Sequence, residues 1–193
     1  MSAATDRPRI YLAGPEVFMP NAKEIGGAKA ALCAAAGCIG AFPLDASLDL
    51  TGLTPLEQAR LISLSNEELM RSCDALIANL TPFRGVSMDS GTAFEVGFMR
   101  ALERPVFGYT NITACYRERA DAFRLLPDWR DGDREEFMVE DFGLVENLMI
   151  DIALRETGVA PVCMEVAPGE ELSDLRGFEA CLAAALAALR DRE

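Results

Sequence analysis

The sequence predicts an α/β fold in which helices flank a doubly wound parallel sheet of about five strands. Short apolar, β-rich runs alternate along the chain with longer segments whose apolar residues have helical spacing. The run at 75–80, Ala-Leu-Ile-Ala-Asn-Leu, is apolar enough for the middle of a parallel sheet, where both strand faces are buried. Since the 193 residues contain no internal repeat or low-complexity linker, we expect one domain over 1–193.

The expected elements are bounded by turn and capping residues. Gly14-Pro15 ends the first strand, and Pro55 occupies the first position of the second helix. The polar segment 110–142 is expected to form an irregular surface insertion. Strands are predicted at 10–13, 39–44, 75–80, 105–109 and, more briefly, 162–166; helices are predicted at 22–36, 54–72, 90–102, 143–156 and 175–189.

Composition excludes several classes of function. Acidic residues outnumber basic ones 31 to 18, and the net charge of −13 disfavours binding to nucleic acids and anionic membranes. The chain has no histidine, which excludes histidine triads, imidazole bases and histidine-containing zinc sites. Acid–base chemistry must therefore come from carboxylates, tyrosine, lysine or cysteine.

Cysteine use and the N-terminus both favour a cytoplasmic protein. The six cysteines form no C-x-x-C pair, and most lie in apolar or helical stretches, as expected for free thiols in a reducing compartment. The first ten residues lack the apolar core of a signal peptide. The longest apolar run, 179–189, is too short to cross a bilayer.

Candidate binding residues lie in the loops that follow the strands, where doubly wound sheets bind their ligands. The Gly14-Pro15 turn is either loop punctuation or part of a pocket wall, and it matches no phosphate-binding glycine pattern. Phe18 and Phe83 are likewise either pocket walls or ordinary packing. Arg84 either grips an anion or hydroxyl-rich ligand or is a solvated loop residue.

The most informative segment is Asp-Ser-Gly-Thr-Ala-Phe-Glu-Val-Gly at 89–97. Asp89 or Ser90 could cap a helix, and Thr92-x-x-Glu95 matches a capping box. However, Glu95 then lies more than one turn inside the helix, on a largely apolar face. An ionised carboxylate buried without a partner is costly, and such a cost is usually tolerated at a functional site.

Two carboxylates near one strand end, Asp89 and Glu95, suggest glycosyl chemistry. One can attack the anomeric carbon of a sugar while another group protonates the leaving group. Tyr11, on the adjacent strand, can donate a hydrogen bond that keeps Glu95 ionised and oriented.

Four motifs in this order and spacing resemble the nucleoside 2-deoxyribosyltransferase family over about residues 9–150. They are I-Y-L-A-G-P-E-V-F (10–18), C-D-A-L-I-A-N-L-T-P-F-R-G (73–85), D-S-G-T-A-F-E-V-G (89–97) and F-G-L-V-E-N-L-M (142–149). The resemblance implies a flavodoxin-like sheet and a dimer-based homo-oligomer whose active sites are completed across subunits. The helical extension at about 171–191 lies outside it and is expected to serve packing or oligomer contact.

The resemblance also assigns roles to individual residues. Glu95 matches the nucleophile, Tyr11 the tyrosine that orients it, and Asp89 an aspartate that contacts the nucleoside. Asn147 matches the asparagine that a neighbouring subunit donates to the sugar. Asn66 stands where some members carry an aspartate proposed to exchange a proton with the base; because an amide is no general acid, Asp89 or a water held by Asn66 becomes the candidate donor.

The function implied is base exchange on a 2′-deoxyribonucleoside with a free nucleobase, through a deoxyribosyl ester on Glu95, without metal or organic cofactor. Gly14, Pro15, Phe18 and Phe83 would then wall the base pocket. One alternative is an N-glycoside hydrolase of deoxynucleosides or their 5′-monophosphates, for which Arg84 is relevant. A second alternative is a non-catalytic nucleotide-binding module, and a third is a structural oligomer-forming domain.

Overall fold

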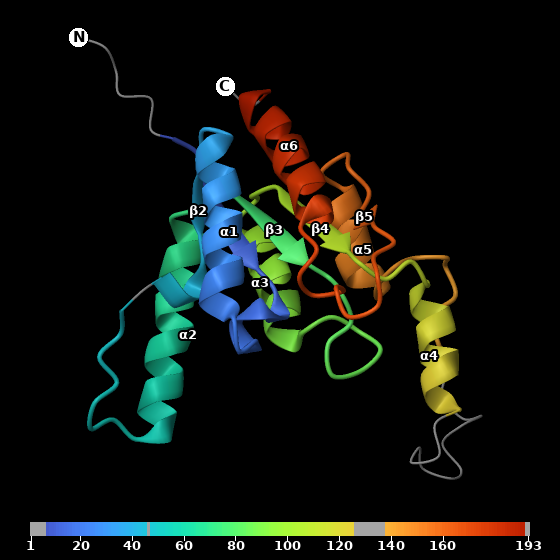
Figure 1. Cartoon of the computed structure of the whole chain (residues 1–193), viewed down its shortest axis with the longest axis horizontal. Helices are drawn as coiled ribbons and strands as arrows, with labels where there is room; N and C mark the ends of the chain where they lie inside the picture. The colour runs from blue at the N-terminus through green and yellow to red at the C-terminus, as the bar shows by residue number, and fades with distance from the viewer. Residues whose placement is uncertain (1–6, 46, 126–137, 192–193) are drawn as a thin grey trace.

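Five parallel strands form one sheet at the centre of the protein (Figure 1). The structure is a computed structural model that describes residues 7–45, 47–125 and 138–191. The strand order is β2-β1-β3-β4-β5, and every neighbouring pair is parallel. This is the flavodoxin-like order, so the predicted fold class is confirmed. The strands are β1 (Arg9–Ala13), β2 (Ile39–Ala41), β3 (Ala75–Asn79), β4 (Val106–Thr110) and β5 (Val162–Cys163).

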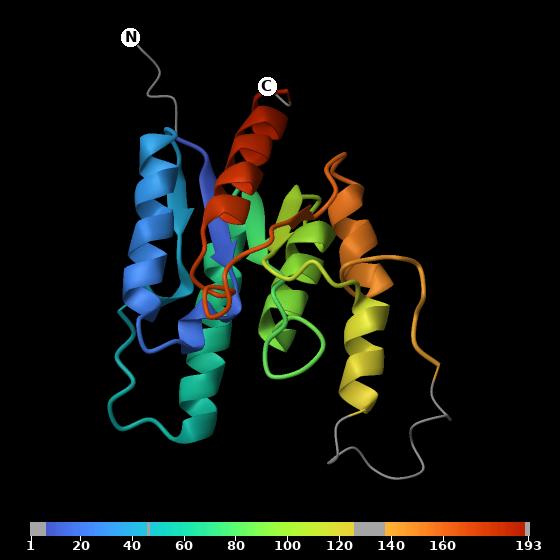
Figure 2. The ribbon, with the colours of Figure 1, turned by 45° about the vertical axis from the view of Figure 1, so that its right-hand side comes forward.

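Helices cover both faces of the sheet (Figures 1 and 2). On one face, α1 (Ala22–Ala35) and α6 (Arg176–Arg190) pack over the side chains of Ile10 and Leu12. On the other face, α2 (Pro55–Arg71), α3 (Ser90–Ala101) and α5 (Leu148–Arg155) pack over Tyr11 and Ala13. Successive residues of β1 thus enter two separate cores, as the alternation of side chains along a strand requires.

The switch in strand order lies between β1 and β3. The chain leaves β1 for β2 on one side of the sheet, and it later returns to place β3 on the other side. Loops diverge at such a point and leave a crevice beyond the carboxyl ends of the strands. This crevice positions the site described below.

The expected N-terminal strand and its loop differ in detail from the structure. The loop after β1 contains a 3₁₀ helix, η1 (Pro15–Phe18), which the sequence did not predict. The strand predicted at 39–44 ends at Ala41, because Pro43 cannot donate a ladder hydrogen bond and starts a second 3₁₀ helix, η2 (Pro43–Asp45).

The prediction of an irregular insertion at 110–142 was wrong for its first part. Thr110 belongs to β4, and residues Tyr116–Arg124 form a helix, α4, which lies beside α5 beyond the edge of the sheet (Figure 2). An i,i+4 pair, Arg117–Asp121 at 2.6 Å, supports this polar helix. Residues 126–137 lie outside the described part of the chain.

Two further boundaries need correction near the C-terminus. The helix predicted at 143–156 begins only at Leu148, because the side chain of Asn147 caps it by accepting from the backbone N–H of Met149 at 3.0 Å. The strand predicted at 162–166 has two residues.

The predicted C-terminal helix is confirmed as α6, and it serves packing. Phe178, Cys181, Leu182 and Ala185 are all buried in the core that it shares with α1. All six cysteines are free thiols, as expected. In the described part of the chain, no helix combines the length and the apolar character needed to span a membrane.

Candidate active site

A pocket of about 260 Å³ opens at the carboxyl end of β1, between η1, η2, α2 and the start of α3. Its polar side chains come from α2 and from the start of α3, and its apolar wall comes from η1, η2 and Ile62. The pocket is lined by Gly14, Val17, Phe18, Pro43, Leu44, Ile62, Asn66, Asp89, Gly91, Thr92 and Glu95. Five predicted site residues therefore meet here: Gly14, Phe18, Asn66, Asp89 and Glu95.

Glu95 is held by a tyrosine from the sheet. The hydroxyl of Tyr11, fully buried on β1, donates to Oε1 of Glu95 at 2.6 Å. The capping box considered for Thr92 and Glu95 is not formed, since Asp89 caps α3 and accepts from the backbone N–H of Thr92 at 3.0 Å. Glu95 is thus free of a capping role and presents its carboxylate to the pocket.

The surroundings of Glu95 make its protonation responsive near neutral pH. The pKa of its carboxyl is raised to about 7: burial raises it most, the hydrogen bond from Tyr11 lowers it, and the charge of Asp89 adds a smaller increase. In the described residues, Glu95 forms no ion pair that would offset this burial. Tyr11 remains a neutral donor, because burial and the charge of Glu95 raise its pKa well above the ordinary value.

Asp89 combines a structural and a pocket-facing role. Its Oδ2 accepts from both the backbone N–H and the hydroxyl of Thr92, at 3.0 and 3.3 Å. Oδ2 is thus engaged by the helix it caps, and the carboxylate that lines the pocket is suited to accept a hydrogen bond from a ligand hydroxyl.

Phe18, which lines the pocket, stacks with Phe83 and Arg84, two predicted site residues that do not line it. The two rings are nearly parallel, with centroids 5.7 Å apart and an interplanar angle of 12°. The guanidinium of Arg84 lies 4.9 Å from the Phe18 centroid and 4.6 Å from the Phe83 centroid, within cation–π range. Arg84 has a φ of 57°, in the left-handed region that non-glycine residues seldom adopt. The cation is therefore held against the two aromatic rings.

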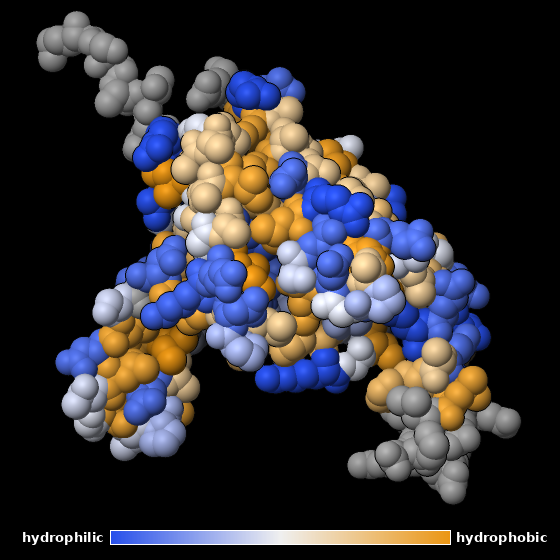
Figure 3. Space-filling view, in the orientation of Figure 1, coloured by the Kyte–Doolittle hydropathy of each residue, from blue (hydrophilic) through white to orange (hydrophobic). Residues whose placement is uncertain are grey.

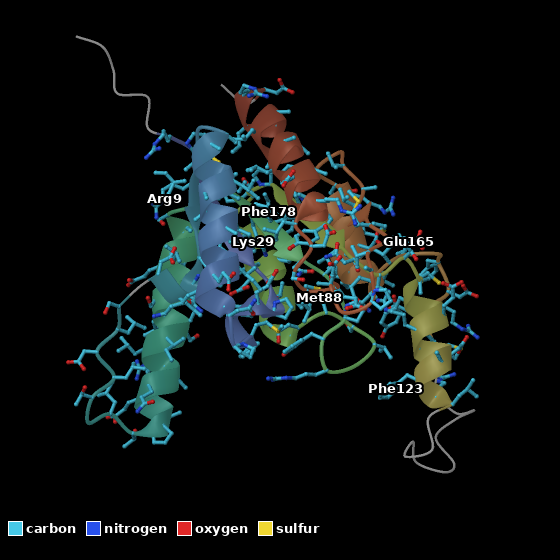
Figure 4. All side chains as sticks on the ribbon, in the orientation of Figure 1. Arg9, Lys29, Met88, Phe123, Glu165 and Phe178 are labelled. Atoms are coloured by element: carbon cyan, nitrogen blue, oxygen red, sulfur yellow. The ribbon has the colours of Figure 1, made fainter. Side chains whose placement is uncertain are left out.

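Beneath the Gly14-Pro15 turn lies a buried cluster that the sequence did not reveal. Glu16 is fully buried, and its Oε1 accepts from Lys29 Nζ at 2.5 Å, Asn79 Nδ2 at 2.8 Å and the Tyr109 hydroxyl at 3.2 Å. Lys29 reaches this cluster from α1 and lies close to the ring of Phe178 on α6, as the two labelled side chains in Figure 4 show.

The Glu16 cluster explains why residue 14 is glycine. A Cβ at position 14 would lie 1.9 Å from Oε2 of Glu16, a distance that no side chain can accommodate. Pro15 is buried as the first residue of η1 and anchors this turn without lining the pocket. The sequence shows locally only a glycine and a proline ahead of Glu16. The cluster could not be predicted from them, because the hydrogen-bond partners of Glu16 come from distant parts of the chain.

Asn147 lies away from the pocket in the single chain. It caps α5, and its amide also donates to Glu140. It lies outside the residues that line the pocket, so any role at an active site would require a second subunit.

Among the residues that the structure describes, no three or more cysteine and acidic side chains are grouped so that they could hold a metal ion.

The order of the strands and the pocket at their switch point define a flavodoxin-like α/β protein with a ligand site built around a buried carboxylate. The family model for nucleoside 2-deoxyribosyltransferase matches residues 10–149. The chain therefore belongs to the nucleoside 2-deoxyribosyltransferase family, as its motifs predicted, and this family supports an enzyme that acts on nucleosides.

Individual relatives agree with this assignment. An uncharacterized protein of Schizosaccharomyces pombe is 32% identical over 166 residues, which cover 78% of this chain and 79% of the relative. The solved 2-desoxiribosyltransferase from Leishmania mexicana is 32% identical, with a TM-score of 0.57, covering 74% of this chain and 85% of that one. A conserved protein from Enterococcus faecalis V583 shares the fold at 15% identity and a TM-score of 0.55, covering 92% and 98% of the two chains.

Proposed function

We propose that the protein exchanges the base of 2′-deoxyribonucleosides, with Glu95 as the nucleophile. The observation that carries this proposal is the half-buried Glu95 carboxylate, held at 2.6 Å by Tyr11 and facing a pocket large enough for a small ligand. Its pKa of about 7 leaves a substantial ionised fraction at neutral pH. Family membership and the similarity to the Leishmania mexicana enzyme support the same chemistry.

In the first half-reaction, the Glu95 carboxylate attacks C1′ of the nucleoside from the face opposite the base. The attacking oxygen is Oε2, because Oε1 is engaged by Tyr11. The C1′–N bond breaks, its electron pair leaves with the base, and the base takes up a proton. The transition state has oxocarbenium character, which the negative carboxylate stabilises.

In the second half-reaction, a nitrogen of another base attacks C1′ and displaces the Glu95 carboxylate. Two inversions restore the original configuration at C1′. Asp89 is placed to accept a hydrogen bond from the sugar. The leaving base takes its proton from a water held by Asn66, and the incoming base returns its N–H proton to the resulting hydroxide as its nitrogen attacks C1′, so the water is restored. Asp89 is less suited to donate, because its Oδ2 already accepts two hydrogen bonds from Thr92.

A 2′-deoxyribose fits this pocket better than ribose for a chemical reason. A 2′-hydroxyl withdraws electrons from the oxocarbenium-like transition state and crowds the nucleophile. The apolar wall of η1 and η2, with Phe18 at its edge, offers a surface for a planar base.

An assay with deoxyinosine and free adenine tests the proposal. Formation of deoxyadenosine and hypoxanthine supports transfer, whereas hypoxanthine with free deoxyribose supports hydrolysis. Measurable binding without turnover would support a non-catalytic module instead. Asn66→Asp then tests the proton path, since a carboxyl that donates to the base changes the pH–rate profile.

Hydrolysis is the second candidate function, and Arg84 is the observation that favours testing it. Its guanidinium is stacked on Phe18 and Phe83, next to the pocket wall, and a guanidinium is suited to bind the phosphate of a 5′-monophosphate. The deciding comparison is the hydrolysis rate of a deoxynucleoside against that of its 5′-monophosphate. A preference for the monophosphate that disappears in R84A would establish the phosphate contact.

We further propose a homo-oligomer in which Asn147 reaches a neighbouring pocket. Support comes from apolar side chains that remain exposed on α2, visible in the lower left of Figure 3: Leu56, Leu61, Ile62 and Leu64. Met149 and Ile152, next to Asn147 on α5, are exposed as well. Sedimentation equilibrium tests the assembly, and mixing E95A with N147A subunits tests sharing, because mixed oligomers would regain activity.

A further inference from the structure

Glu146 is a fully buried carboxylate outside the pocket, and the proposed reaction does not use it. Each of its oxygens accepts two hydrogen bonds. Oε1 accepts from the Ser87 hydroxyl at 2.6 Å and from the backbone N–H of Asn147 at 3.0 Å. Oε2 accepts from the backbone N–H of Met88 at 3.0 Å and from Arg119 at 3.3 Å. Four donors on three segments therefore converge on one side chain.

Arg119 brings α4 into the same cluster. Its Nε donates to the carbonyl of Val86, and its two terminal nitrogens donate to the carbonyls of Ala114 and Val145, all at 2.7 Å. The side chain is only 9% exposed. A guanidinium can satisfy several fixed carbonyls at once, whereas a lysine ammonium lacks this planar fork.

The cluster holds the chain immediately before Asp89. Val86, Ser87 and Met88 are fixed by Arg119 or Glu146, and the next residue is the pocket-lining cap of α3. Figure 4 labels Met88 at this approach to α3. The segment 81–88 has no regular secondary structure of its own, so these contacts set where Asp89 begins the helix.

We propose that Glu146 and Arg119 form a positioning pair that holds Asp89 in the pocket, an inference that rests on the proposed function. The pair makes α4 part of the active-site support, although α4 stands beyond the edge of the sheet. It acts through the 86–88 segment and touches neither sugar nor base.

Glu146→Gln tests this geometry with little change in shape. An amide nitrogen in place of Oε2 would face the N–H of Met88 and Arg119 and lose both hydrogen bonds. In place of Oε1 it would lose the N–H of Asn147, while the Ser87 hydroxyl could turn and accept, so at least one hydrogen bond is lost whichever way the amide turns. We expect KM for the nucleoside to rise about tenfold, with a smaller fall in kcat, because Asp89 is displaced from its binding position. Arg119→Met is expected to act in the same direction.

The pH–rate profile supplies a readout that a merely structural role would not move. Glu95 is faced by Tyr11 from β1, by Asp89 at the start of α3, and by Asn66 and Glu67 from α2. Of these groups, the positioning pair contacts only the segment that carries Asp89. When the charge of Asp89 moves away, the acid limb should shift to lower pH, as in D89N.

Matched variants separate positioning from loss of stability. R117M removes an arginine from the same helix whose partners are Asp121 and Asp141, and it should leave KM and the acid limb unchanged. Ser87→Ala removes one donor without leaving a buried charge unpaired, so it should fold even where E146Q does not. We expect it to raise KM about threefold, corresponding to part of one hydrogen bond.

Titration of the Glu95 carboxyl by ¹³C NMR, assigned with E95Q, gives an answer that does not depend on turnover. A lower Glu95 pKa in S87A and E146Q, with the wild-type value in R117M, supports the positioning pair. Wild-type values in both S87A and R119M would overturn it. Absence of turnover in the wild-type enzyme would overturn the proposed function, while the titration would still decide the positioning of Asp89.

Discussion

Two glutamates, Glu16 and Glu95, approach the end of β1 from opposite faces of the sheet and have different surroundings. Glu16 is fully buried with a lysine and two further donors on one oxygen. Glu95 has one donor, Tyr11, and a like charge, Asp89, nearby. A carboxylate that is fully buried with a cation and several donors serves the fold. One with a single donor titrates near neutrality and is suited to chemistry.

Of all the substitutions considered, a change of Glu95 should have the largest effect on the exchange rate. E95Q should lower the exchange rate by roughly 10⁴-fold or more, because it removes the proposed nucleophile. The fold should persist, since the amide oxygen can still accept from Tyr11. Chromatographic exchange assays and circular dichroism measure the two effects, and normal exchange by E95Q would contradict the assignment.

The same variant has a signed effect on stability. The folded protein holds the Glu95 proton more tightly than the unfolded chain, because the folded pKa is about 7 and the ordinary value is 4.5. Wild-type stability from this group is therefore fully present below pH 4.5 and is lost as the pH rises through 7. E95Q lacks this loss, so its stability relative to the wild type should increase across that range in urea unfolding.

Lys29→Met should have the largest effect on the free energy of unfolding. It leaves the Glu16 carboxylate buried without its cation, and the free energy of unfolding should fall by about 3–5 kcal/mol. The double variant E16Q/K29M removes both charges and should recover part of that loss. Chemical denaturation measures the cycle, and a double variant less stable than K29M would show that charge pairing is not the cause.

Tyr11→Phe removes the hydrogen-bond donor of Glu95 and so tests the difference between the surroundings of Glu95 and Glu16. A hydrogen bond to a charged group contributes about 1.5–3 kcal/mol, so kcat/KM should fall roughly tenfold to a hundredfold. Because that hydrogen bond lowers the pKa of Glu95, its loss should move the acid limb of the pH–rate profile to higher pH. A limb that stays in place or moves down would contradict the role given to Tyr11.

Asp89→Asn should give the smallest shift of the acid limb of the pH–rate profile, in the direction opposite to that of Tyr11→Phe. Removing the charge of Asp89 lowers the pKa of Glu95, so the acid limb should move to lower pH. The helix cap should survive, because asparagine caps as well as aspartate. E156Q, which removes one exposed carboxylate paired with Arg100, is the control and should leave the limb unchanged.

The elements predicted well from sequence are those with strong local signals. β3 is a continuous apolar run, and α2 begins with proline after a threonine that forms a capping box. The hydrogen bond between Tyr11 and Glu95 was also predicted, since β1 and the helix that follows the neighbouring strand β3 meet at the switch point. α4 was missed because it is short and mostly charged, so that its few apolar residues at helical spacing, Tyr116, Ala120 and Phe123, do not stand out from the polar segment around them.

The parts that could not be predicted depend on contacts between distant residues. Glu16 meets Asn79 and Tyr109 across 63 and 93 residues, and no local pattern marks Lys29 within its alanine-rich helix as buried. Glu146 lies within the motif at 142–149, but nothing in that motif indicates that the side chain is buried or that its hydrogen-bond donors come from three segments. The proposed role of Asn147 involves a second subunit, and the sequence pattern of one chain cannot position a residue relative to another chain.

The helix α6 bears on how this chain can be shortened. It follows the region matched by the family model, yet Phe178 packs edge-on against Tyr109, and a Cβ on Gly177 would come within 2.7 Å of the Tyr109 ring. Truncation after residue 149 would remove one of the two helices that cover this face of the sheet, and with it the Phe178 ring that lies against Lys29. A minimal fragment for expression or crystallisation should therefore extend through α6.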